Sequence, residues 1–471
     1  MNSDLSFLKS FILVSVFSIS ALFVKAQDGA ILYGKNCAQC HGANLNGGNA
    51  ASLIDGVWQF GAEDGYQFRN IKFGISHLGM PSYELTLQDD EIRAIMQYVK
   101  NEATKAGAEK PPIAKEIETL DYNINVEIFA EGLEVPWAID FLDKNTALIT
   151  ERPGRLRVVK NGKLQQEPIK NTPKVLNEGQ GGLLDVAVDP DYKNNGWIYL
   201  AYSHVLENSK EGERPGAMTR IVRGKIEGNS WINEEVLFEA PQETYRTTRH
   251  HYGCRIVFDP WGHLYFCIGD RGAGDQAQDF TRPNGKVHRI YTDGSIPESN
   301  PFMAEEAAMK SLYSLGNRNI QGMAIHPENG QLWVTEHGPM GGDELNLIEA
   351  GKNYGWPVIT YGLNYNGTII TEQTHKPGME QPIVYWKPSI AVCGLDFYRG
   401  NLFKKWENKL LVGALKYEEV RLLSLEKDRV MHQEVIVKNQ GRVRDVSTGP
   451  DGAIYVVLNK PGTVIRLTPK K

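Results

Sequence analysis

A six-fold repeat of one hairpin constrains the fold of this chain more than any other feature of its sequence. Each copy consists of an apolar strand, a turn of the Asp-Pro-x-Gly kind and a second apolar strand, and the copies recur about every 50–70 residues. They occupy residues 139–150, 186–203, 256–270, 323–336, 395–414 and 446–458. Radial architectures repeat a unit in this way. We therefore expect an all-β six-bladed β-propeller rather than a generic all-β sandwich with ordinary hairpin turns.

The chain before the repeats has a different composition. Residues 1–26 combine Lys9, an apolar run and small residues at a cleavage point, which is typical of a secretory signal peptide. We expect a small all-α domain over residues 27–104, a linker rich in Ala, Lys, Glu and Pro over 105–120, and the propeller over 121–471. The protein is therefore predicted to be periplasmic or secreted.

The small N-terminal domain ends in a helix with a clear apolar face. Thr86 suits the N-cap of this helix and Asp89 its third position. Four apolar residues recur at helical spacing and are expected to be buried together. They are Ile92, Ile95, Met96 and Val99.

The overall composition excludes several classes of function. Hydrophobic residues make up 41% and charged residues 23% of the chain, as in an ordinary globular protein. The formal net charge of -6 argues against a nucleic-acid partner, which requires a clustered positive surface. No segment after the signal is apolar enough to cross a bilayer, so we expect no stable membrane span.

Two of the five cysteines lie in the motif CAQCH, residues 37–41. A disulfide between residues so close together would be strained, no other feature supports a thioredoxin-like unit, and zinc would need two more ligands nearby. Covalent attachment of haem c accounts for the whole motif. Cys37 and Cys40 would form the thioethers, and His41 would bind the haem iron.

A second axial ligand for the iron is expected downstream. Met80 lies between Gly79 and Pro81 in a loop, where a thioether ligand is a better interpretation than core filler, and His77 is the alternative. The segment 27–104, with its CAQCH motif, this methionine and its closing helix, resembles the small class I cytochromes c.

The other three cysteines form no evident framework. Cys254 and Cys267 flank the turn of the third hairpin at equal distances, which would place them opposite each other. A cross-strand disulfide is one interpretation, and two buried free thiols are the favoured one. Cys393 has no evident partner.

Polar side chains precede several repeats at similar offsets. The first strand of a propeller blade starts near the central axis, so polar residues entering these strands converge on one face of the channel. Imidazole, guanidinium and ammonium groups gathered there would form a pocket for a compact polyanion. These residues are Gln180, His251, Arg318, Asn319, Arg442 and Arg444, with Lys416 after the fifth hairpin. Singly, each could be a solvated surface group, and Arg255 and Arg289 are interpreted as structural or surface residues.

Longer motifs surround the same residues. They are EGQGGLLDVAVDPDY (178–192), RHHYGCRIVFDP (249–260), IGDRG (268–272), SLGNRNIQGMAIHP (314–327), TEHGPMGGDELNLIEAGKNYGWP (335–357), LKYEEV (415–420) and GRVRDV (441–446). Together they resemble the soluble sugar dehydrogenases that use pyrroloquinoline quinone (PQQ), of the aldose and glucose/sorbosone type. The resemblance spans nearly all of residues 120–469 and implies a six-bladed propeller.

This resemblance implies roles for individual residues. His251 would be the general base that takes the proton of the C1 hydroxyl of the sugar while hydride passes to the quinone. The main-chain carbonyls of Gly338 and Pro339 would bind a calcium ion that also binds the quinone. The three carboxylates of PQQ would be bound by Arg318, Asn319, Lys416, Arg442 and Arg444. Pocket neighbours would be Gln180, Asp343 and Trp386, together with His337. The implied cofactors are haem c, PQQ and calcium.

Two residues depart from the pattern of the glucose-type members. His337 stands in the turn before the calcium carbonyls where those members have Gln, as in the broader aldose type. His250 precedes the expected base where an acidic residue can occur, and it competes with His251 for that role. The Tyr-Gly-Cys-Arg that follows favours His251. Both departures put a preference for glucose in doubt.

Together these features predict an exported quinohaemoprotein, a propeller preceded by a small all-α cytochrome c domain. It would oxidise an aldose to its lactone and pass electrons singly through PQQ and haem to an external respiratory acceptor. One alternative is a nitrite reductase of cytochrome–propeller type, against which the six repeats and the axial cations argue. Another is a propeller without quinone that binds protein partners, against which the full set of cations and His251 argue.

Overall fold

The computed structural model describes residues 29–58, 60–61, 63–76, 79–107, 112–206 and 214–470. The chain divides between Ile113 and Ala114 into two compact units. The predicted signal peptide and the alternative iron ligand His77 lie outside the described residues. None of the described helices is long and apolar enough to cross a membrane.

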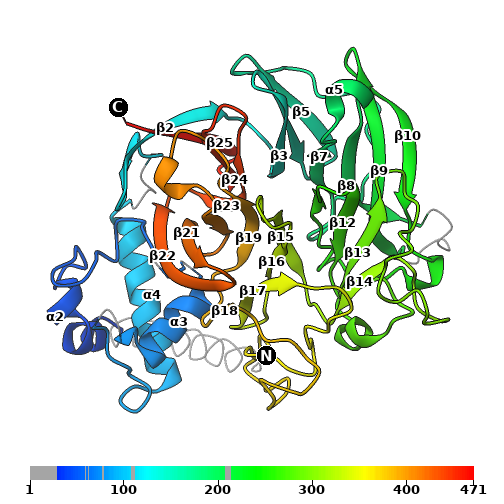
Figure 1. Cartoon of the computed structure of the whole chain (residues 1–471). Coiled ribbons are helices and arrows are strands. Elements are labelled where there is room, and N and C mark those ends of the chain that lie inside the picture. Colours follow the sequence, from blue (N-terminus) through cyan, green and yellow to red (C-terminus); the bar gives the residue numbers. More distant parts are fainter. Residues whose placement is uncertain are drawn as a thin grey trace, which may run out of the picture. The chain divides into compact units, whose positions relative to one another are not determined.

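Helices make up the N-terminal unit. Residues 29–36 are helical, and they are followed by α2 (Ala38–His41), α3 (Asp64–Phe73) and α4 (Asp89–Lys105) (Figure 1). The apolar face of α4 packs in a buried cluster with residues such as Tyr33. The predicted face is confirmed by the burial of Ile92, Ile95, Met96 and Val99.

The start of α4 differs from the prediction. Gln88 is the N-cap, and its backbone N–H donates to the Glu91 carboxylate at 2.8 Å within a capping box. The prediction of Thr86 as the cap is wrong, because a Gln–Glu pair here makes the reciprocal bonds that the pattern assigns to Ser or Thr with Glu. Asp89 is the first helical residue rather than the third.

Six antiparallel sheets form the larger unit, and their first strands contact one another in a ring around a central axis. Blade 1 consists of β3 (Pro136–Asp143), β4 (Thr146–Glu151), β5 (Arg155–Lys160) and β6 (Lys163–Leu164). Blade 2 consists of β7 (Leu183–Val188), β8 (Ile198–Val205), β9 (Ala217–Glu227) and β10 (Ser230–Phe238). Blade 3 consists of β11 (Ile256–Phe258), β12 (His263–Ile268), β13 (Lys286–Tyr291) and β14 (Leu312–Leu315).

The next two blades repeat the same order of strands. Blade 4 consists of β15 (Ile320–Ile325), β16 (Leu332–Glu336), β17 (Asp343–Ile348) and β18 (Val384–Trp386). Blade 5 consists of β19 (Val392–Phe397), β20 (Leu410–Ala414), β21 (Glu419–Glu426) and β22 (Arg429–Lys438). The connections between strands contain the short helix α5 (Tyr192–Asn195) and the 3-10 turns η2 (Gln242–Thr244), η3 (Gly274–Gln278) and η4 (Lys404–Trp406).

Blade 6 closes the ring with strands from both ends of the propeller segment. Its strands are β23 (Arg442–Thr448), β24 (Ile454–Lys460), β25 (Thr463–Pro469), β2 (Asn123–Ala130) and β1 (Glu116–Glu118). Strand β2 runs beside β25, with Val126 opposite Leu467 (Figure 1). The linker predicted over residues 105–120 is too long, because β1 pairs with β2 as an edge strand.

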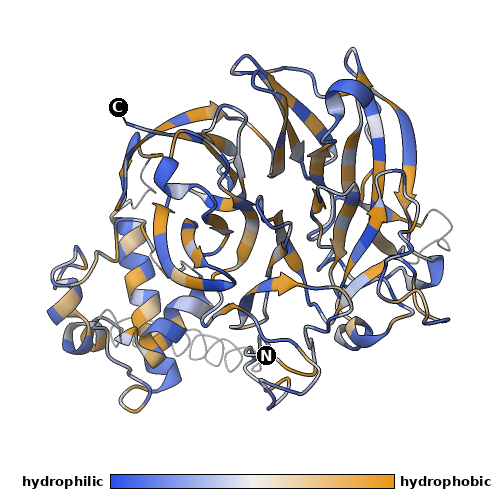
Figure 2. Ribbon diagram, in the orientation of Figure 1, coloured by the Kyte–Doolittle hydropathy of each residue, from blue (hydrophilic) through white to orange (hydrophobic). Residues whose placement is uncertain are grey.

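The repeat predicted from the sequence is confirmed blade by blade. Its six hairpins are the strand pairs β3–β4, β7–β8, β11–β12, β15–β16, β19–β20 and β23–β24. These strands are apolar along most of their length because neighbouring sheets cover both of their faces. The first five residues of β7, for example, are all buried. Figure 2 shows apolar residues recurring along the strands.

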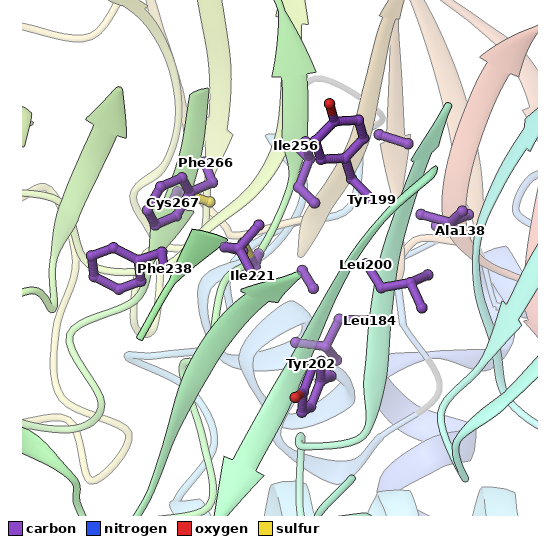
Figure 3. Packing of buried hydrophobic residues seen from close by; sticks show 14 of the residues in the cluster. Ala138, Leu184, Tyr199, Leu200, Tyr202, Ile221, Phe238, Ile256, Phe266 and Cys267 are labelled. Carbon is purple, nitrogen blue, oxygen red and sulfur yellow. The ribbon is translucent and has the colours of Figure 1, made fainter. Parts of the chain in front are cut away.

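The largest hydrophobic core is shared between neighbouring blades. Leu184, Leu200 and Ile221 of blade 2 belong to one buried cluster with Ile256 and Phe266 of blade 3 (Figure 3). Burial of apolar area is the main favourable contribution to folding. It holds each blade against the next, so the first strands stay in register around the axis.

Two buried cysteines form hydrogen bonds between neighbouring blades. Cys267 Sγ donates to the main-chain oxygen of Ile320 at 3.7 Å. Cys393 Sγ donates to the main-chain oxygen of Val443 at 3.1 Å. In both cases the sulfur belongs to one blade and the acceptor to the next, so these thiols have structural partners.

The third hairpin is offset by one residue from the expected register. Ile256 pairs with Phe266, so Cys254 and Cys267 are not directly opposite each other, and that expectation is wrong. Both are buried free thiols, which confirms the favoured interpretation. The register of this hairpin, with Phe258 opposite Leu264, would place Ile268 rather than Cys267 opposite Cys254.

The guanidinium of Arg255 joins blades across the axis. It donates to Asp185 of blade 2 at 3.0 Å and lies 2.9 Å from Asp445 of blade 6. Its remaining N–H groups donate to the main-chain oxygens of Gln321 in blade 4, at 2.9 Å, and of Arg444 in blade 6, at 3.1 Å. Arg255 is 5% exposed, so the structural interpretation is confirmed for this residue.

The positive charge of Arg255 and the carboxylates of Asp185 and Asp445 compensate one another only while all three are present. Burial raises the pKa of Asp185 to about 7, while the positive charge of Arg255 acts to lower it. Burial also raises the pKa of Asp445, again against the influence of Arg255. Removing one member of a buried ion pair leaves an uncompensated charge or a forced protonation, which is far more costly than the pair itself is stabilising.

We expect Arg255→Met to lower the free energy of unfolding of the propeller by about 3–5 kcal/mol, because two buried carboxylates lose their counter-ion. Denaturant-induced unfolding of the full chain would measure this. Arg289→Met is the matched control, since the Arg289 side chain donates to the neutral groups of Asn300 and Ser299, both at 2.8 Å. That variant should lose about 1–3 kcal/mol. Equal losses in the two variants would contradict the central role of Arg255.

Candidate active site

The predicted site residues gather at one end of the propeller channel. In an antiparallel hairpin the start of the first strand and the end of the second lie side by side, so residues at both places share one end of the ring. At or before the starts of first strands lie Gln180, His251, Arg318, Asn319 and Arg442, and Arg444 is the third residue of β23. After the ends of second strands lie His337, Gly338, Pro339 and Lys416.

His251 is held from two sides. Its backbone N–H donates to the side-chain oxygen of Gln180 at 2.8 Å, and its ring Nδ1 lies 2.6 Å from Oδ1 of Asp270. The second carboxylate oxygen of Asp270 accepts the indole N–H of Trp356 at 2.8 Å. His251 has a φ of 55°, which non-glycine residues seldom adopt. The ring is therefore positioned by contacts that specify its orientation.

Asp270 determines which ring nitrogen of His251 is free. Burial lowers the pKa of His251 to about 4, and the hydrogen bond to Asp270 only partly opposes this. Burial acts to raise the pKa of Asp270, but the hydrogen bond from His251 and the charge of Arg318 lower it. Near neutral pH a neutral imidazole therefore donates from Nδ1 to a carboxylate, and Nε2 keeps its lone pair.

His250 lies beside His251 but has a different environment. The two ring centroids are 4.6 Å apart. The ring of His250 lies against Gly272, where a Cβ atom would come within 2.5 Å of Nε2. Burial and the charge of Arg271 lower the pKa of His250. Within the described part of the chain no carboxylate is hydrogen-bonded to its ring, so the geometry favours His251 as an oriented base.

Arg318 and Arg444 approach the channel from different blades. Arg318 donates to the main-chain oxygens of His337, at 3.0 Å, and Gly338, at 2.9 Å. Arg444 donates across the axis to the side-chain oxygen of Gln321 at 2.7 Å. Burial, followed by the charge of Arg442, lowers the pKa of Arg444 to about 9. Neither arginine is ion-paired to a carboxylate of the described residues.

Several buried polar atoms at this end of the channel have no partner. Among the described residues they include Nε of Arg318 and of Arg444, and Nε2 of His337. A buried polar atom without a hydrogen bond is costly, and a buried cation without a counter-ion more so. These residues therefore fit a polyanionic ligand, as the carboxylates of PQQ would provide.

Glu336 holds the segment that presents Arg318. Its carboxylate accepts the backbone N–H of Arg318 and, at 2.8 Å, the side-chain N–H of Asn317. Burial raises the pKa of Glu336 to about 7, although both hydrogen bonds act to lower it. The carboxylate thus fixes two consecutive residues at the channel.

Gly338 and Pro339 lie in a tight turn between β16 and β17. A Cβ atom on Gly338 would come within 2.2 Å of the main-chain oxygen of Gly342, so glycine is required here. The Pro339 carbonyl accepts the hydroxyl of Ser389 at 3.2 Å. Each carbonyl oxygen has a second lone pair, and calcium prefers such oxygen ligands. The described residues contain no cluster of three or more His, Cys, Asp or Glu suited to a metal.

Asp343 and Trp386, two of the predicted pocket residues, form hydrogen bonds within the protein. Both carboxylate oxygens of Asp343 accept backbone N–H groups, from Gly338 at 2.9 Å and from Val392 at 3.1 Å, so Asp343 ties this turn to blade 5. The indole N–H of Trp386 donates to Gln433 at 3.2 Å. Lys416 is half-buried directly after blade 5's second strand. Their proposed roles toward PQQ stay predictions, as do those of Asn319 and Arg442.

Sequence reasoning assigned no role to Asp270, Trp356 or Glu336. A positional signal exists for Asp270, which is the second residue after β12, just as Lys416 is the second after β20. Trp356 comes from the long connection between β17 and β18, where no repeat fixes its position. Glu336 is the last residue of β16, and its contacts with Asn317 and Arg318 emerge only from the paired strands.

The CAQCH motif of the N-terminal unit folds into one short helical turn. Cys37 is the N-cap of α2, and the backbone N–H groups of Cys40 and His41 donate to its carbonyl at 3.1 and 3.0 Å. His41 Nδ1 lies 2.9 Å from the main-chain oxygen of Ala51. In metal-binding histidines, a hydrogen bond at one ring nitrogen orients the ring and leaves the other nitrogen for the metal. The contact with Ala51 would therefore leave Nε2 of His41 for the haem iron.

Met80 lies in a short turn stabilised by backbone pairing. Met80 and Ile75 exchange two backbone hydrogen bonds, of 2.9 and 3.3 Å. Gly74 packs so closely beneath this turn that a Cβ atom would lie 2.7 Å from the Met80 carbonyl oxygen. The turn therefore gives the predicted thioether ligand a fixed backbone.

Two different family models match the chain, one in each of its two compact units. The family model described as glucose/sorbosone dehydrogenase matches residues 133–466. The model described as cytochrome c oxidase, cbb3-type, subunit III matches residues 24–99. The first match covers most of the chain, including blades 1–5 and the C-terminal strands of blade 6, and the second includes the CAQCH motif.

Individual relatives agree with the family match. The chain is 40% identical over 352 residues to the aldose sugar dehydrogenase YliI of Escherichia coli, covering 74% of this chain and 93% of the relative. It is 27% identical to quinoprotein glucose dehydrogenase B of Acinetobacter calcoaceticus, covering 73% and 87%. The crystal structure of the soluble aldose sugar dehydrogenase from Escherichia coli matches with a TM-score of 0.69 and 38% identity, covering 74% of this chain and all of that one. The chain therefore belongs to the glucose/sorbosone dehydrogenase family and carries an N-terminal cytochrome c domain.

Proposed function

We propose that this protein is an exported PQQ-dependent aldose dehydrogenase that passes electrons through its own haem c. The observation that carries the proposal is the 2.6 Å contact between His251 Nδ1 and Asp270 beside guanidinium groups that lack carboxylate partners. The names of the relatives, an aldose sugar dehydrogenase and a quinoprotein glucose dehydrogenase, support it. The product would be the lactone of the sugar.

The chain's own residues would bind and orient PQQ at the channel end. When bound, PQQ supplies the two-electron acceptor for oxidation at C1 of the sugar. Arg318, Arg442 and Arg444 would contribute charge-assisted hydrogen bonds to its carboxylates. Lys416 and Asn319 would complete this set of donors. The Gly338 and Pro339 carbonyls would hold calcium, which would polarise the quinone.

His251 would act as the general base. Its Nε2 is available to accept the proton of the C1 hydroxyl, because Nδ1–H is occupied by Asp270. The imidazolium formed in this way would be stabilised by the same carboxylate. Trp356 and Gly272 donate to Asp270 at 2.8 Å each, so the carboxylate keeps its place while the proton moves.

The N-terminal domain would relay the electrons. Cys37, Cys40 and His41, together with Met80, would hold haem c, which would supply a one-electron carrier between the propeller and a respiratory acceptor. A tether gives the haem a high effective concentration at the propeller without a diffusive encounter. Export is supported by the apolar N-terminal segment and by the haem motif, which belongs to exported cytochromes.

Sugar-driven reduction of the haem tests this function directly. The haem-loaded chain would be mixed with PQQ, calcium and a panel of aldoses while the haem absorption bands are followed. Reduction that requires all three additions is the expected result. A protein that binds no PQQ and is reduced by none of the aldoses would instead be a quinone-free propeller. Reduction of nitrite by the chain would favour the other alternative.

We expect His251→Ala to lower the rate of sugar-driven haem reduction by about 10²–10⁴-fold, because the general base is lost. PQQ binding should be unchanged, since the imidazole is not one of the proposed carboxylate ligands. His250→Ala is the matched control and should keep at least a tenth of the activity. A full loss in the His250 variant, with activity kept in the His251 variant, would move the base to His250.

The pH profile should depend on Asp270. Since the hydrogen bond to Asp270 raises the pKa of His251, Asp270→Asn should lower that pKa further and shift the acid limb of kcat/KM to lower pH. The maximal rate should also fall by at least about 10-fold, because the Nδ1–H tautomer is no longer favoured. Stopped-flow haem reduction across the acid range measures both effects. An acid limb that moves to higher pH would contradict the assigned hydrogen bond.

Replacing both Cys37 and Cys40 by Ala should separate aldose oxidation in the propeller from electron relay through the haem. The variant should carry no covalent haem after denaturing electrophoresis, because both thioethers are lost. It should still oxidise aldoses with a small soluble dye as acceptor, since the propeller forms a compact unit of its own that contains all the proposed PQQ ligands. Loss of dye-linked activity in this variant would show that the haem is needed for more than electron relay.

A further inference from the structure

Arg152 stands at the channel end without an assigned role. It is the first residue after β4, the second strand of blade 1, and so lies at the same end of its hairpin as Lys416 and Asp270, each the second residue after its strand, in blades 5 and 3. Its backbone N–H donates to the main-chain oxygen of Val135 at 3.1 Å. Its own carbonyl accepts the N–H of Leu183 at 3.0 Å. Arg152 is thus fixed between the first strands of blades 1 and 2.

The side chain of Arg152 runs beside the segment that holds His251. A Cβ atom on Gly182 would come within 2.2 Å of the Arg152 carbonyl oxygen and 2.9 Å of its Cγ, so only glycine allows this approach. Gly182 is two residues from Gln180, whose side-chain oxygen accepts the backbone N–H of His251. The base of the Arg152 side chain therefore borders the candidate active site.

The guanidinium of Arg152 forms no hydrogen bond or ion pair with any residue that the structure describes, and its Nε is buried. The adjacent acid, Glu151, is paired with Arg155 at 2.5 Å. Burial lowers the pKa of Arg152, and the charge of Arg442 lowers it further. Arg152 in turn contributes to the lowered pKa of Arg444.

Three guanidinium groups of blades 1 and 6 are thus close enough to influence one another. Arg152, Arg442 and Arg444 have no carboxylate partner among the described residues, whereas Arg255 deeper in the channel has two. Like charges gathered in a partly buried site destabilise the empty protein unless an anion compensates them. The cations proposed for PQQ come from blades 4, 5 and 6, which leaves the blade 1 side of the pocket to Arg152.

We propose that Arg152 is a further anion-binding residue of this pocket, which together with Arg442 and Arg444 binds a carboxylate of PQQ. This rests on the proposed function. A guanidinium can donate two parallel hydrogen bonds to a carboxylate, and such bonds are stronger than those between neutral groups. Arg152 would then act in cofactor affinity, with no part in proton transfer.

Titration of PQQ into the calcium-loaded full chain, followed by quenching of tryptophan fluorescence, tests the inference without measuring turnover. Arg152→Met should raise the Kd for PQQ by about 10–100-fold, and its dependence on salt should weaken. Arg152→Lys should recover part of the affinity as a point charge. Arg429→Met removes the same charge from an exposed position on β22 and should leave the Kd unchanged.

Thermal unfolding without PQQ distinguishes an anion-binding role of Arg152 from a structural one. If Arg152 stabilised the fold, its replacement would lower the Tm of the cofactor-free protein. Because Arg152→Met removes a like-charge repulsion, its cofactor-free Tm should equal or exceed that of the wild type. The rise in Tm on adding PQQ should be smaller than in the wild type, because stabilisation by a ligand at a given concentration decreases as its Kd rises.

Three results for Arg152→Met would overturn the inference. The first is an unchanged Kd for PQQ, and the second is a cofactor-free Tm below that of Arg429→Met. The third is a raised KM for the sugar with an unchanged Kd for PQQ, which would assign Arg152 to substrate binding. A wild-type protein that binds no PQQ would refute the proposed function itself. Binding by the wild type with no effect of Arg152→Met would refute the role of Arg152 alone.

Discussion

The interaction on which the propeller depends is the buried contact of Arg255 with Asp185 and Asp445. One guanidinium that begins in blade 3 reaches blades 2, 4 and 6 through hydrogen bonds and ion pairs, and its Cζ lies 4.2 Å from the ring of Trp137 in blade 1. Hydrophobic burial between blades is non-directional and would tolerate small rotations of one blade against the next. A charge shared by several blades at the axis resists such rotations, because every misplacement leaves a buried ion uncompensated.

The axis therefore contains two kinds of cation. Arg255 is neutralised within the fold, whereas Arg152, Arg442 and Arg444 have no carboxylate partner among the described residues. The same distinction applies to the acids, since Asp185 and Asp445 belong to the scaffold while Asp270 serves the ring of His251. The arginines that the fold leaves without carboxylate partners are the ones that we propose bind the cofactor. The paired charges at the axis, in contrast, stabilise the scaffold.

The repeat predicted the architecture because its signals are local. Each Asp-Pro-x-Gly turn and its apolar strands carry the same information six times, so errors in one copy hardly matter. Single positions were less predictable: Gln88 replaced Thr86 as the cap of α4, and a one-residue offset displaced Cys254 from Cys267. His251, Arg318 and Arg444 were predicted as site residues from their offsets to the repeat. Asp270 and Trp356 were not, because their roles depend on a neighbour that only folding brings close.

The closure of the ring by β2 and β25 links the pocket to the completeness of the chain. Arg442 and Arg444 lie on β23, in the sheet that is finished only when strands from both ends of the propeller segment have paired. Strand β23 also lies against β19 of blade 5 and β3 of blade 1, so these two arginines belong to the blade at which the ring closes. If PQQ binds as proposed, the free energy of its contacts with Arg442 and Arg444 would therefore add to the stability of molecules in which this last blade is in place.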